Sequence, residues 1–176
     1  HVAARLVEAI NKADKGTLFC GYGARDAREE VFALAEKLKA PVGHSFRGKM
    51  YFEYDNPFDV GMSGLLGYGA CLDAMEESDL FIMVGTDFPY TDWLPEENVA
   101  QIDIDGAHIG RRTKVDYPVV GDVQSVIENI LPHVEEKTDR SFLDKMLKRH
   151  YQLLEHVVKS YTEEAFESKK PCLLYT

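Results

Sequence analysis

Two carboxylates near the middle of the chain have a spacing suited to binding vicinal hydroxyls. Asp103 and Asp105 end the apolar run that begins at Val99, and their separation by two positions predicts that both project to the same side of a strand. Carboxylates at the end of a strand suit the two hydroxyls of a ribose. For Asp105, which precedes Gly106 and Ala107, capping of a helix is an equally good interpretation.

A second polar segment, residues 85–90, directly follows the most apolar run of the sequence, residues 80–84. It supplies a threonine and an aspartate for hydrogen bonds, whereas Phe88 and Tyr90 offer flat surfaces for a ring. In a parallel α/β sheet, ligands bind at the carboxyl ends of the strands, and we expect this segment at such an end.

Four glycines make residues 61–69 able to approach a ligand closely through the backbone. We expect this stretch to lead into a helix over about residues 68–75, whose free N–H groups and positive dipole end would face a pyrophosphate. A flexible connector is the alternative. Ser63, in the run Gly-Met-Ser-Gly, lacks the G-x-S-x-G setting of a hydrolase nucleophile.

Gly21 and Gly23 follow the first expected strand and match the beginning of a dinucleotide-binding fingerprint. That fingerprint requires a third glycine where Asp26 stands, and an acidic residue at the end of the second strand, which here continues into Ser45. A standard NAD-binding half is therefore not indicated. A tight turn between strand and helix explains the two glycines.

Other residue types that could do chemistry lack a productive spacing. The six histidines show no H-x-x-x-H or comparable spacing of metal ligands, and we expect His150 and His156 to face solvent on a charged helix. Cys20, Cys71 and Cys172 form no C-x-x-C pair, which favours reduced thiols over a disulfide framework or a zinc site. The chain carries no self-contained active site.

The hydrophobic pattern predicts strands that alternate with helices. Helices are expected near the amino terminus (residues 2–10), after Gly23, and after Asp122, which is a good N-cap. Pro132 should end or kink the last of these. Between the strands, residues 45–61 read as an irregular, aromatic, functional loop. Short apolar strands are expected at residues 17–20, 41–44, 80–84, 99–104 and 115–120.

Strands that are apolar on both faces and separated by helices are typical of a parallel sheet covered on two sides. We therefore predict an α/β fold, a doubly wound, Rossmann-like, three-layer sandwich. We expect residues 1–137 to form the cofactor-binding domain and residues 138–176 to form a helical connector to a further domain. The connector reads as one charged helix over residues 140–166. Its thin apolar stripe consists of Phe142, Met146, Leu153, Val157 and Tyr161.

Composition narrows the function classes. A chain of 176 residues with 45% hydrophobic and 28% charged residues is one globular domain with a core. The net charge of −10 makes nucleic acid and anionic membrane surfaces poor partners. No apolar run approaches the roughly 20 residues that span a bilayer, and the first residues lack a signal-peptide layout. We expect a cytoplasmic protein.

Several long motifs of the sequence are similar to those of one known family. They occupy residues 39–49 and 53–67 and continue through residues 85–90, 101–105, 109–110, 120–122, 135–140 and 142–144. In these motifs the sequence resembles the central domain of thiamine-diphosphate-dependent pyruvate oxidases, particularly the quinone-reducing pyruvate dehydrogenase branch. The resemblance covers most of the chain.

The resemblance implies a deoxyhypusine-synthase-like NAD/FAD-binding sandwich that holds FAD. Two outer domains would hold thiamine diphosphate and Mg²⁺ between the subunits of a homo-oligomer, and the enzyme would pass electrons from decarboxylated pyruvate to the flavin. No catalytic residue or metal ligand is implied in this chain. By motif match, the flavin contacts fall on Ser63, Gly64, Leu65, Leu66, Thr86, Asp87, Phe88, Pro89, Tyr90 and Asp103, with Gly21 and Asp105 as further candidates.

The sequence also departs from the family pattern. The family's cofactor-activating glutamate and Gly-Asp-Gly magnesium motif belong to the outer domains, and Gly121-Asp122-Val123 is not that motif. The fragment alone is therefore expected to be inactive. Residues 169–176 fit the start of the last domain poorly.

Two alternatives to a pyruvate oxidase domain stay open. One is a cofactor-free central domain that serves as spacer and subunit contact, and the other is an acetolactate-synthase-like flavin domain. Retention of Thr86, Asp87 and Asp103 favours a cofactor binder, and the run at residues 53–57 favours a pyruvate oxidase. Arg47 could contact the flavin or a partner domain, or could be solvated surface.

Overall fold

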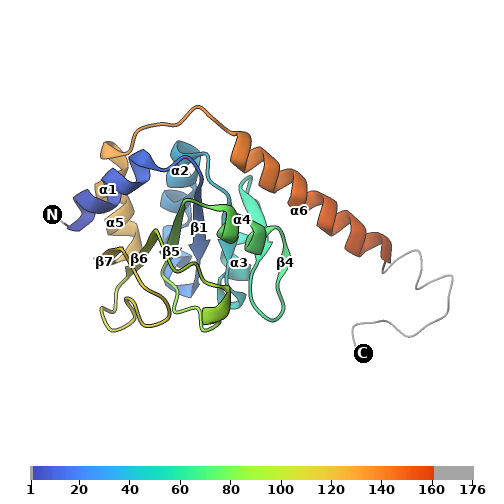
Figure 1. The fold of residues 1–176 in the computed structure, drawn as a ribbon, viewed down its shortest axis with the longest axis horizontal. Helices are drawn as coiled ribbons and strands as arrows, with labels where there is room; N and C mark the ends of the chain where they lie inside the picture. The colour runs from blue at the N-terminus through green and yellow to red at the C-terminus, as the bar shows by residue number, and fades with distance from the viewer. Residues whose placement is uncertain (1, 161–176) are drawn as a thin grey trace.

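The protein is described by a computed structural model that covers residues 2–160. Helices and strands alternate along the chain, except that the strands within residues 59–69 and those within residues 80–120 follow one another without an intervening α-helix (Figure 1). The helices are α1 (Val2–Lys12), α2 (Arg28–Leu38), α3 (Lys49–Phe52), α4 (Cys71–Glu77), α5 (Val123–Ile130) and α6 (Ser141–Lys159). The strands are β1 (Gly16–Cys20), β2 (Val42–His44), β3 (Asp59–Met62), β4 (Tyr68–Gly69), β5 (Leu80–Val84), β6 (Val99–Asp103) and β7 (Tyr117–Val120). Short 3-10 helices are η1 (Tyr22–Ala27), η2 (Phe46–Gly48), η3 (Thr91–Trp93) and η4 (Leu131–His133).

These strands form one seven-stranded sheet in the order β4-β3-β2-β1-β5-β6-β7. All neighbouring strands are parallel except the edge strand β4, which runs antiparallel to β3. The strand order reverses between β1 and β5, because β2 and β3 lie on one side of β1 and β5 to β7 lie on the other. This topology confirms the predicted doubly wound sheet.

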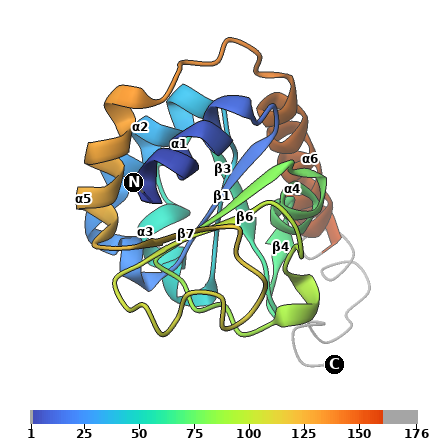
Figure 2. The same ribbon diagram turned by 60° about the vertical axis from the view of Figure 1, so that its left-hand side comes forward.

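Helices cover both faces of the sheet and produce three layers (Figure 2). Helices α1, α2 and α5 pack on one face, whereas α4 and α6 pack on the other. Strands β1, β5 and β6 are buried at every position, which explains why their apolar residues do not alternate with exposed ones; β6 also buries the polar side chains of Gln101 and Asp103.

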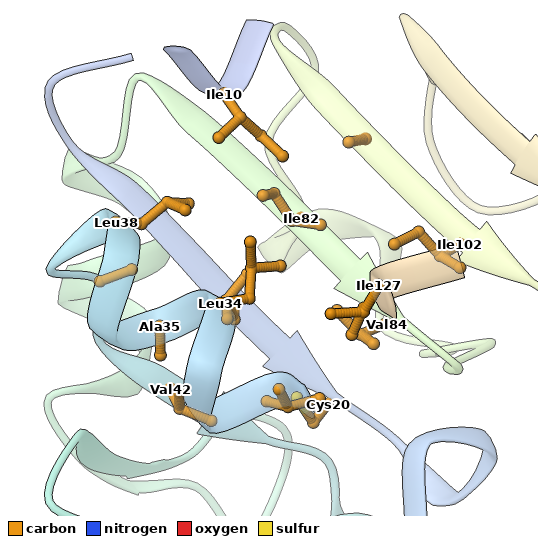
Figure 3. Packing of buried hydrophobic residues seen from close by; sticks show 14 of the residues in the cluster. Ile10, Cys20, Leu34, Ala35, Leu38, Val42, Ile82, Val84, Ile102 and Ile127 are labelled. Carbon is orange, nitrogen blue, oxygen red and sulfur yellow. The ribbon is translucent and has the colours of Figure 1, made fainter. Parts of the chain in front are cut away.

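The larger core lies between the sheet and helices α1, α2 and α5. Leu34 of α2 and Ile127 of α5 meet Ile82 of β5 and Ile102 of β6 in this layer (Figure 3). These four side chains are fully buried, and each contributes about 1.5–3 kcal/mol relative to an exposed position. The buried face of α2 consists of Val31, Leu34, Ala35 and Leu38, and Ala27 at the end of η1 continues it.

Helix α5 begins and ends where the sequence predicts. The Asp122 carboxylate accepts a hydrogen bond from the backbone N–H of Ser125 at 3.0 Å, which is the geometry of an N-cap. The helix ends at Ile130, and Pro132 lies in the short 3-10 helix η4 that follows. Proline cannot donate the hydrogen bond that would extend the α-helix.

The region from residue 45 to residue 69 differs from the expectation of a loop followed by a helix. It contains η2, α3 and the β3–β4 hairpin, and the glycine-rich stretch forms the turn of this hairpin. Helix α4 begins only at Cys71. Period-2 and period-3.6 patterns cannot be distinguished over segments of two to four residues, so these elements left no signal in the sequence.

Helix α6 packs its first half on the domain and extends outward from it (Figure 1). Phe142 and Met146 of the predicted stripe are buried, Leu153 is half-buried and Val157 is largely exposed. Tyr161, Cys172 and the tail at 169–176 lie outside the described residues. Among the helices that the structure describes, none has the length and hydrophobicity that a bilayer-spanning segment requires.

Candidate functional site

The loops after β1 and β5 meet where the strand order reverses, the usual ligand position in a doubly wound sheet. Here the two loops touch backbone to backbone. The Gly23 N–H donates to the Gly85 carbonyl oxygen at 2.9 Å, and a Cβ on Gly21 would lie 2.5 Å from both that oxygen and the Thr86 Cβ. Gly85 itself has a φ of +59°. Gly21 and Gly23 thus make a tight turn that fills the crevice between the two loops with main chain, and a ligand bound at this edge would lie over these loops.

Asp87 is held by two arginines of the loop between β6 and β7. Arg112 donates from Nε to Asp87 Oδ1 at 3.0 Å and from its terminal nitrogen to Oδ2 at 3.2 Å. Arg111 also donates to both oxygens. Burial opposes the charged form, but the bonds from Arg112 and Arg111 outweigh it and lower the pKa of Asp87. The carboxylate therefore anchors one loop to another.

The two aromatic residues of this segment have different surroundings. Phe88 is buried, with its ring edge-on to Phe19 at 5.0 Å and to Tyr90 at 5.2 Å. The expectation that Phe88 offers a flat surface to a ring is wrong, because the core covers it. Tyr90 is 37% exposed and remains accessible, as does Pro89 beside it.

The turn of the β3–β4 hairpin packs against this same tyrosine. Gly64 has a φ of +119°, and a Cβ there would lie 3.3 Å from the Tyr90 ring. Ser63 is buried, whereas Leu65 and Leu66 are 74% and 68% exposed. Because β4 intervenes before α4, the turn does not open directly into a helix N-terminus as expected. The exposed backbone and leucines of the turn are what it can offer to a ligand.

Asp103 ends β6 as a buried carboxylate with one oxygen engaged. Its Oδ1 accepts from the Asp105 N–H at 2.9 Å and lies 3.3 Å from Nδ1 of His108. No described residue donates a hydrogen bond to its Oδ2, so this oxygen remains available to a ligand. Asp105 lies beyond the strand, is more exposed, and accepts from the Ala107 N–H within a turn and not a helix. These carboxylate oxygens are acceptors and fit a ribose whose hydroxyl groups donate.

A buried glutamine that the sequence analysis did not single out connects these loops. Gln101 on β6 donates to the carbonyls of Thr86 at 3.4 Å and His108 at 3.2 Å, and accepts from the Gly110 N–H at 3.0 Å. His108, Arg111 and Arg112 were likewise not predicted as site residues. The consecutive arginines after Gly110 were a visible signal; Gln101 carried none, because its burial depends on tertiary packing.

The predicted site residues therefore lie along one edge of the sheet. Gly21 touches Thr86, Gln101 connects Thr86 to the loop after Asp103, and Gly64 packs on Tyr90. No group of three or more His, Cys, Asp or Glu residues within residues 2–160 could hold a metal ion. The fold and the position of this edge define the class of Rossmann-like α/β domains.

The family follows from comparison with known proteins. The family described as "Thiamine pyrophosphate enzyme, central domain" matches residues 3–130. This match covers well over half of the chain, so the protein belongs to that family.

Individual relatives agree with this assignment. The chain is 34% identical over 155 residues to the putative thiamine pyrophosphate-containing protein YdaP of Bacillus subtilis, covering 88% of this chain and 27% of that protein. It is 33% identical over 135 residues (72% and 23%) to a probable acetolactate synthase large subunit of Methanocaldococcus jannaschii. It is 28% identical over 141 residues (78% and 23%) to pyruvate oxidase of Lactiplantibacillus plantarum. The chain spans about a quarter of the length of each.

Proposed function

We propose that this chain is the FAD-binding central domain of a pyruvate oxidase. In this proposal, other domains of a longer cytoplasmic, homo-oligomeric protein bind thiamine diphosphate and Mg²⁺ and decarboxylate pyruvate. The bound flavin supplies the capacity to accept electrons from the decarboxylated substrate. The residues of this chain bind and orient it.

The observation that carries the proposal is the contiguity of the candidate segments. The hairpin turn, the loop after β5 and the end of β6 are far apart in sequence, yet contacts at Gly64–Tyr90 and Gln101–Thr86 connect them. An elongated dinucleotide that crosses a closed crevice needs such a continuous edge. Parallel topology alone would bring these loops together in a spacer domain too, so the unengaged Oδ2 of Asp103 at this edge is what favours a cofactor binder.

Within this edge, Asp103 is the residue best placed to hold the adenosine ribose. Its free Oδ2 can accept a hydrogen bond from a ribose hydroxyl, while Asp105 and His108 fix the orientation of the carboxylate through Oδ1. Tyr90 and the exposed leucines of the hairpin turn, Leu65 and Leu66, would contact apolar parts of the cofactor. Asp87 would act indirectly, by holding the loop in place.

An acetolactate-synthase-like flavin domain is the second candidate, favoured by the higher identity to the acetolactate synthase relative. The run at residues 53–57 was expected to favour a pyruvate oxidase. It forms a turn in which the Arg28 guanidinium donates to the carbonyls of Tyr54 and Asp55, and Asn56 donates to Phe52 O at 2.7 Å. Because these bonds give residues 53–57 a role in the local structure, the run is weaker evidence for a pyruvate oxidase.

One experiment separates the candidates. The full-length protein is purified, its bound cofactor is released and identified, and pyruvate turnover is followed with an artificial electron acceptor. A pyruvate oxidase should contain FAD and reduce the acceptor. Acetolactate formation without reduction of the acceptor would support the second candidate, and absence of flavin binding would refute both.

A further inference from the structure

His150 is the last buried residue of α6, although its charged surroundings in the sequence predicted exposure to solvent. Its imidazole fills a slot between Gly61 of β3 and Gly69 of β4, which face each other across the hairpin. A Cβ on Gly61 would lie 3.1 Å from its Cε1, and a Cβ on Gly69 would collide with its Nδ1. Each strand thus has a glycine, which has no side chain, at the position where the imidazole packs.

The slot places His150 against a carboxylate that a second buried histidine also faces. His150 Nε2 lies 3.6 Å from Asp59 Oδ2, and His44 Nε2 lies 3.9 Å from Asp59 Oδ1. Within the described residues, Nδ1 of His150 and Nε2 of His44 are buried without a hydrogen-bond partner of good geometry, although the Val60 backbone beside His150 favours its protonated form. One acid thus lies between two imidazoles that are incompletely bonded.

The other charged groups around this cluster form neutral pairs. On α3, Lys49 contacts Glu53 at 2.6 Å, and Tyr68 of β4 bonds with both. Where α6 packs on α4, Arg149 pairs with Asp73 at 3.0 Å. Beside His150 on α6, the Tyr151 ring makes an edge contact with the imidazole. Among the described residues, Asp59 is therefore the carboxylate that faces both imidazoles directly, and the charge of Glu53 also favours the protonated form of His150.

Acid acts on this cluster through the carboxyl and the imidazoles. Burial raises the pKa of Asp59 to about 6, whereas it lowers the pKa of His44 to about 4 and lowers the pKa of His150 as well. Near pH 5 the Asp59 carboxyl is therefore mostly neutral, which by itself relieves a buried charge. A proton taken up by His150 under these conditions creates a buried cation without a counter-ion, and because burial lowers the pKa of His150, this protonation favours the released imidazole.

We propose that His150 makes the docking of α6 dependent on pH, so that acid releases the helix from His150 onward while its first half stays in place. The first half is anchored by Phe142, Leu143 and Met146, none of which titrates. Beyond His150, packing is sparse: Leu153 and Trp93 line a cavity of about 250 Å³. Little therefore opposes release once the imidazole is charged.

Hydrogen–deuterium exchange of the full-length protein, read by mass spectrometry and corrected for intrinsic rates, tests this proposal. A peptide from residues 147–159 should exchange about tenfold faster near pH 5 than at neutral pH, a factor equivalent to about 1.4 kcal/mol. Peptides from α5, on the opposite face of the sheet, should remain protected.

The matched variants are His150→Gln, which cannot become charged, and His156→Gln, which removes an exposed histidine from the same helix. The first should lose the acid response and the second should keep it. An α6 peptide whose protection is constant or increases in acid overturns the proposal. So does an acid response that persists in His150→Gln, or in His150→Asn if the glutamine variant does not fold.

Discussion

Replacing Asp103 by asparagine removes one charge from the proposed ribose site while keeping the shape of the side chain. The asparagine Oδ1 can still accept from the Asp105 N–H, the 2.9 Å bond that positions the native carboxylate. The group at the position of Oδ2 becomes an NH₂, which donates where the carboxylate accepts. The variant therefore tests the ligand-facing oxygen with little disturbance of the loop.

The expected loss follows from the kind of hydrogen bond that is removed. A bond to a charged group contributes about 1.5–3 kcal/mol, whereas a neutral one contributes about 0.5–1.5 kcal/mol. Replacing one charged hydrogen bond by a neutral one costs roughly 1–1.5 kcal/mol of binding free energy. If both ribose hydroxyls bond to the side chain, the cost is at most about twice as large. Since 1.4 kcal/mol corresponds to a factor of about ten, FAD affinity should fall by about tenfold or more.

Titration of FAD into the full-length apoprotein, followed by quenching of flavin fluorescence, measures this loss. Asp105→Asn is the control, because that side chain is 55% exposed and its charge is screened by water. We expect less than about a threefold effect there. Equal dissociation constants for wild type and Asp103→Asn, with unchanged thermal stability, would show that Asp103 is structural and that the ribose is held elsewhere.

Three further predictions concern the isolated chain, the crevice and the buried acid. The chain alone, supplied with thiamine diphosphate, Mg²⁺ and FAD, should not decarboxylate pyruvate, and measurable CO₂ release would contradict this. Gly21→Ala should destabilise the domain by several kcal/mol in urea unfolding, because the new Cβ would lie 2.5 Å from the backbone oxygen of Gly85. Unchanged stability would mean that the loops after β1 and β5 move apart to accommodate the methyl group. Asp59→Asn should have a free energy of unfolding roughly 3 kcal/mol higher than wild type at neutral pH, because the native state disfavours the charged carboxylate whose pKa it raises. This difference should vanish towards about pH 4, where the wild-type carboxyl is protonated. Equal effects at both pH values in chemical denaturation would argue against a raised pKa.

The long periodic elements could be predicted from the sequence because one pattern determined each of them. Strand β5 has the predicted bounds, and α5 has the predicted cap. The β3–β4 hairpin could not be predicted, because its strands are too short to show alternation. His150 was misjudged for another reason. It lies four residues after Met146 and three before Leu153, so the apolar stripe of α6 already contained its position, but its residue type suggested solvent.

The candidate site shows the same division between local and tertiary information. Asp103 and Tyr90 were recognised from residue type and strand position, and their placement at one edge follows from parallel topology. The burial of Phe88 and the bridging role of Gln101 depend on neighbours that are distant in sequence. Their positions emerge only when the loops are brought together.

The backbone contact between Gly23 and Gly85 also limits how this scaffold can be engineered. An attempt to install a nicotinamide cofactor by restoring a third glycine and an acidic strand end would leave the crevice occupied by main chain. Because main-chain atoms cannot be trimmed by substitution, the change would require the loops after β1 and β5 to be rebuilt together. Redesign of ligand preference should therefore begin with the exposed residues that lie over the crevice, and leave its closed floor unchanged.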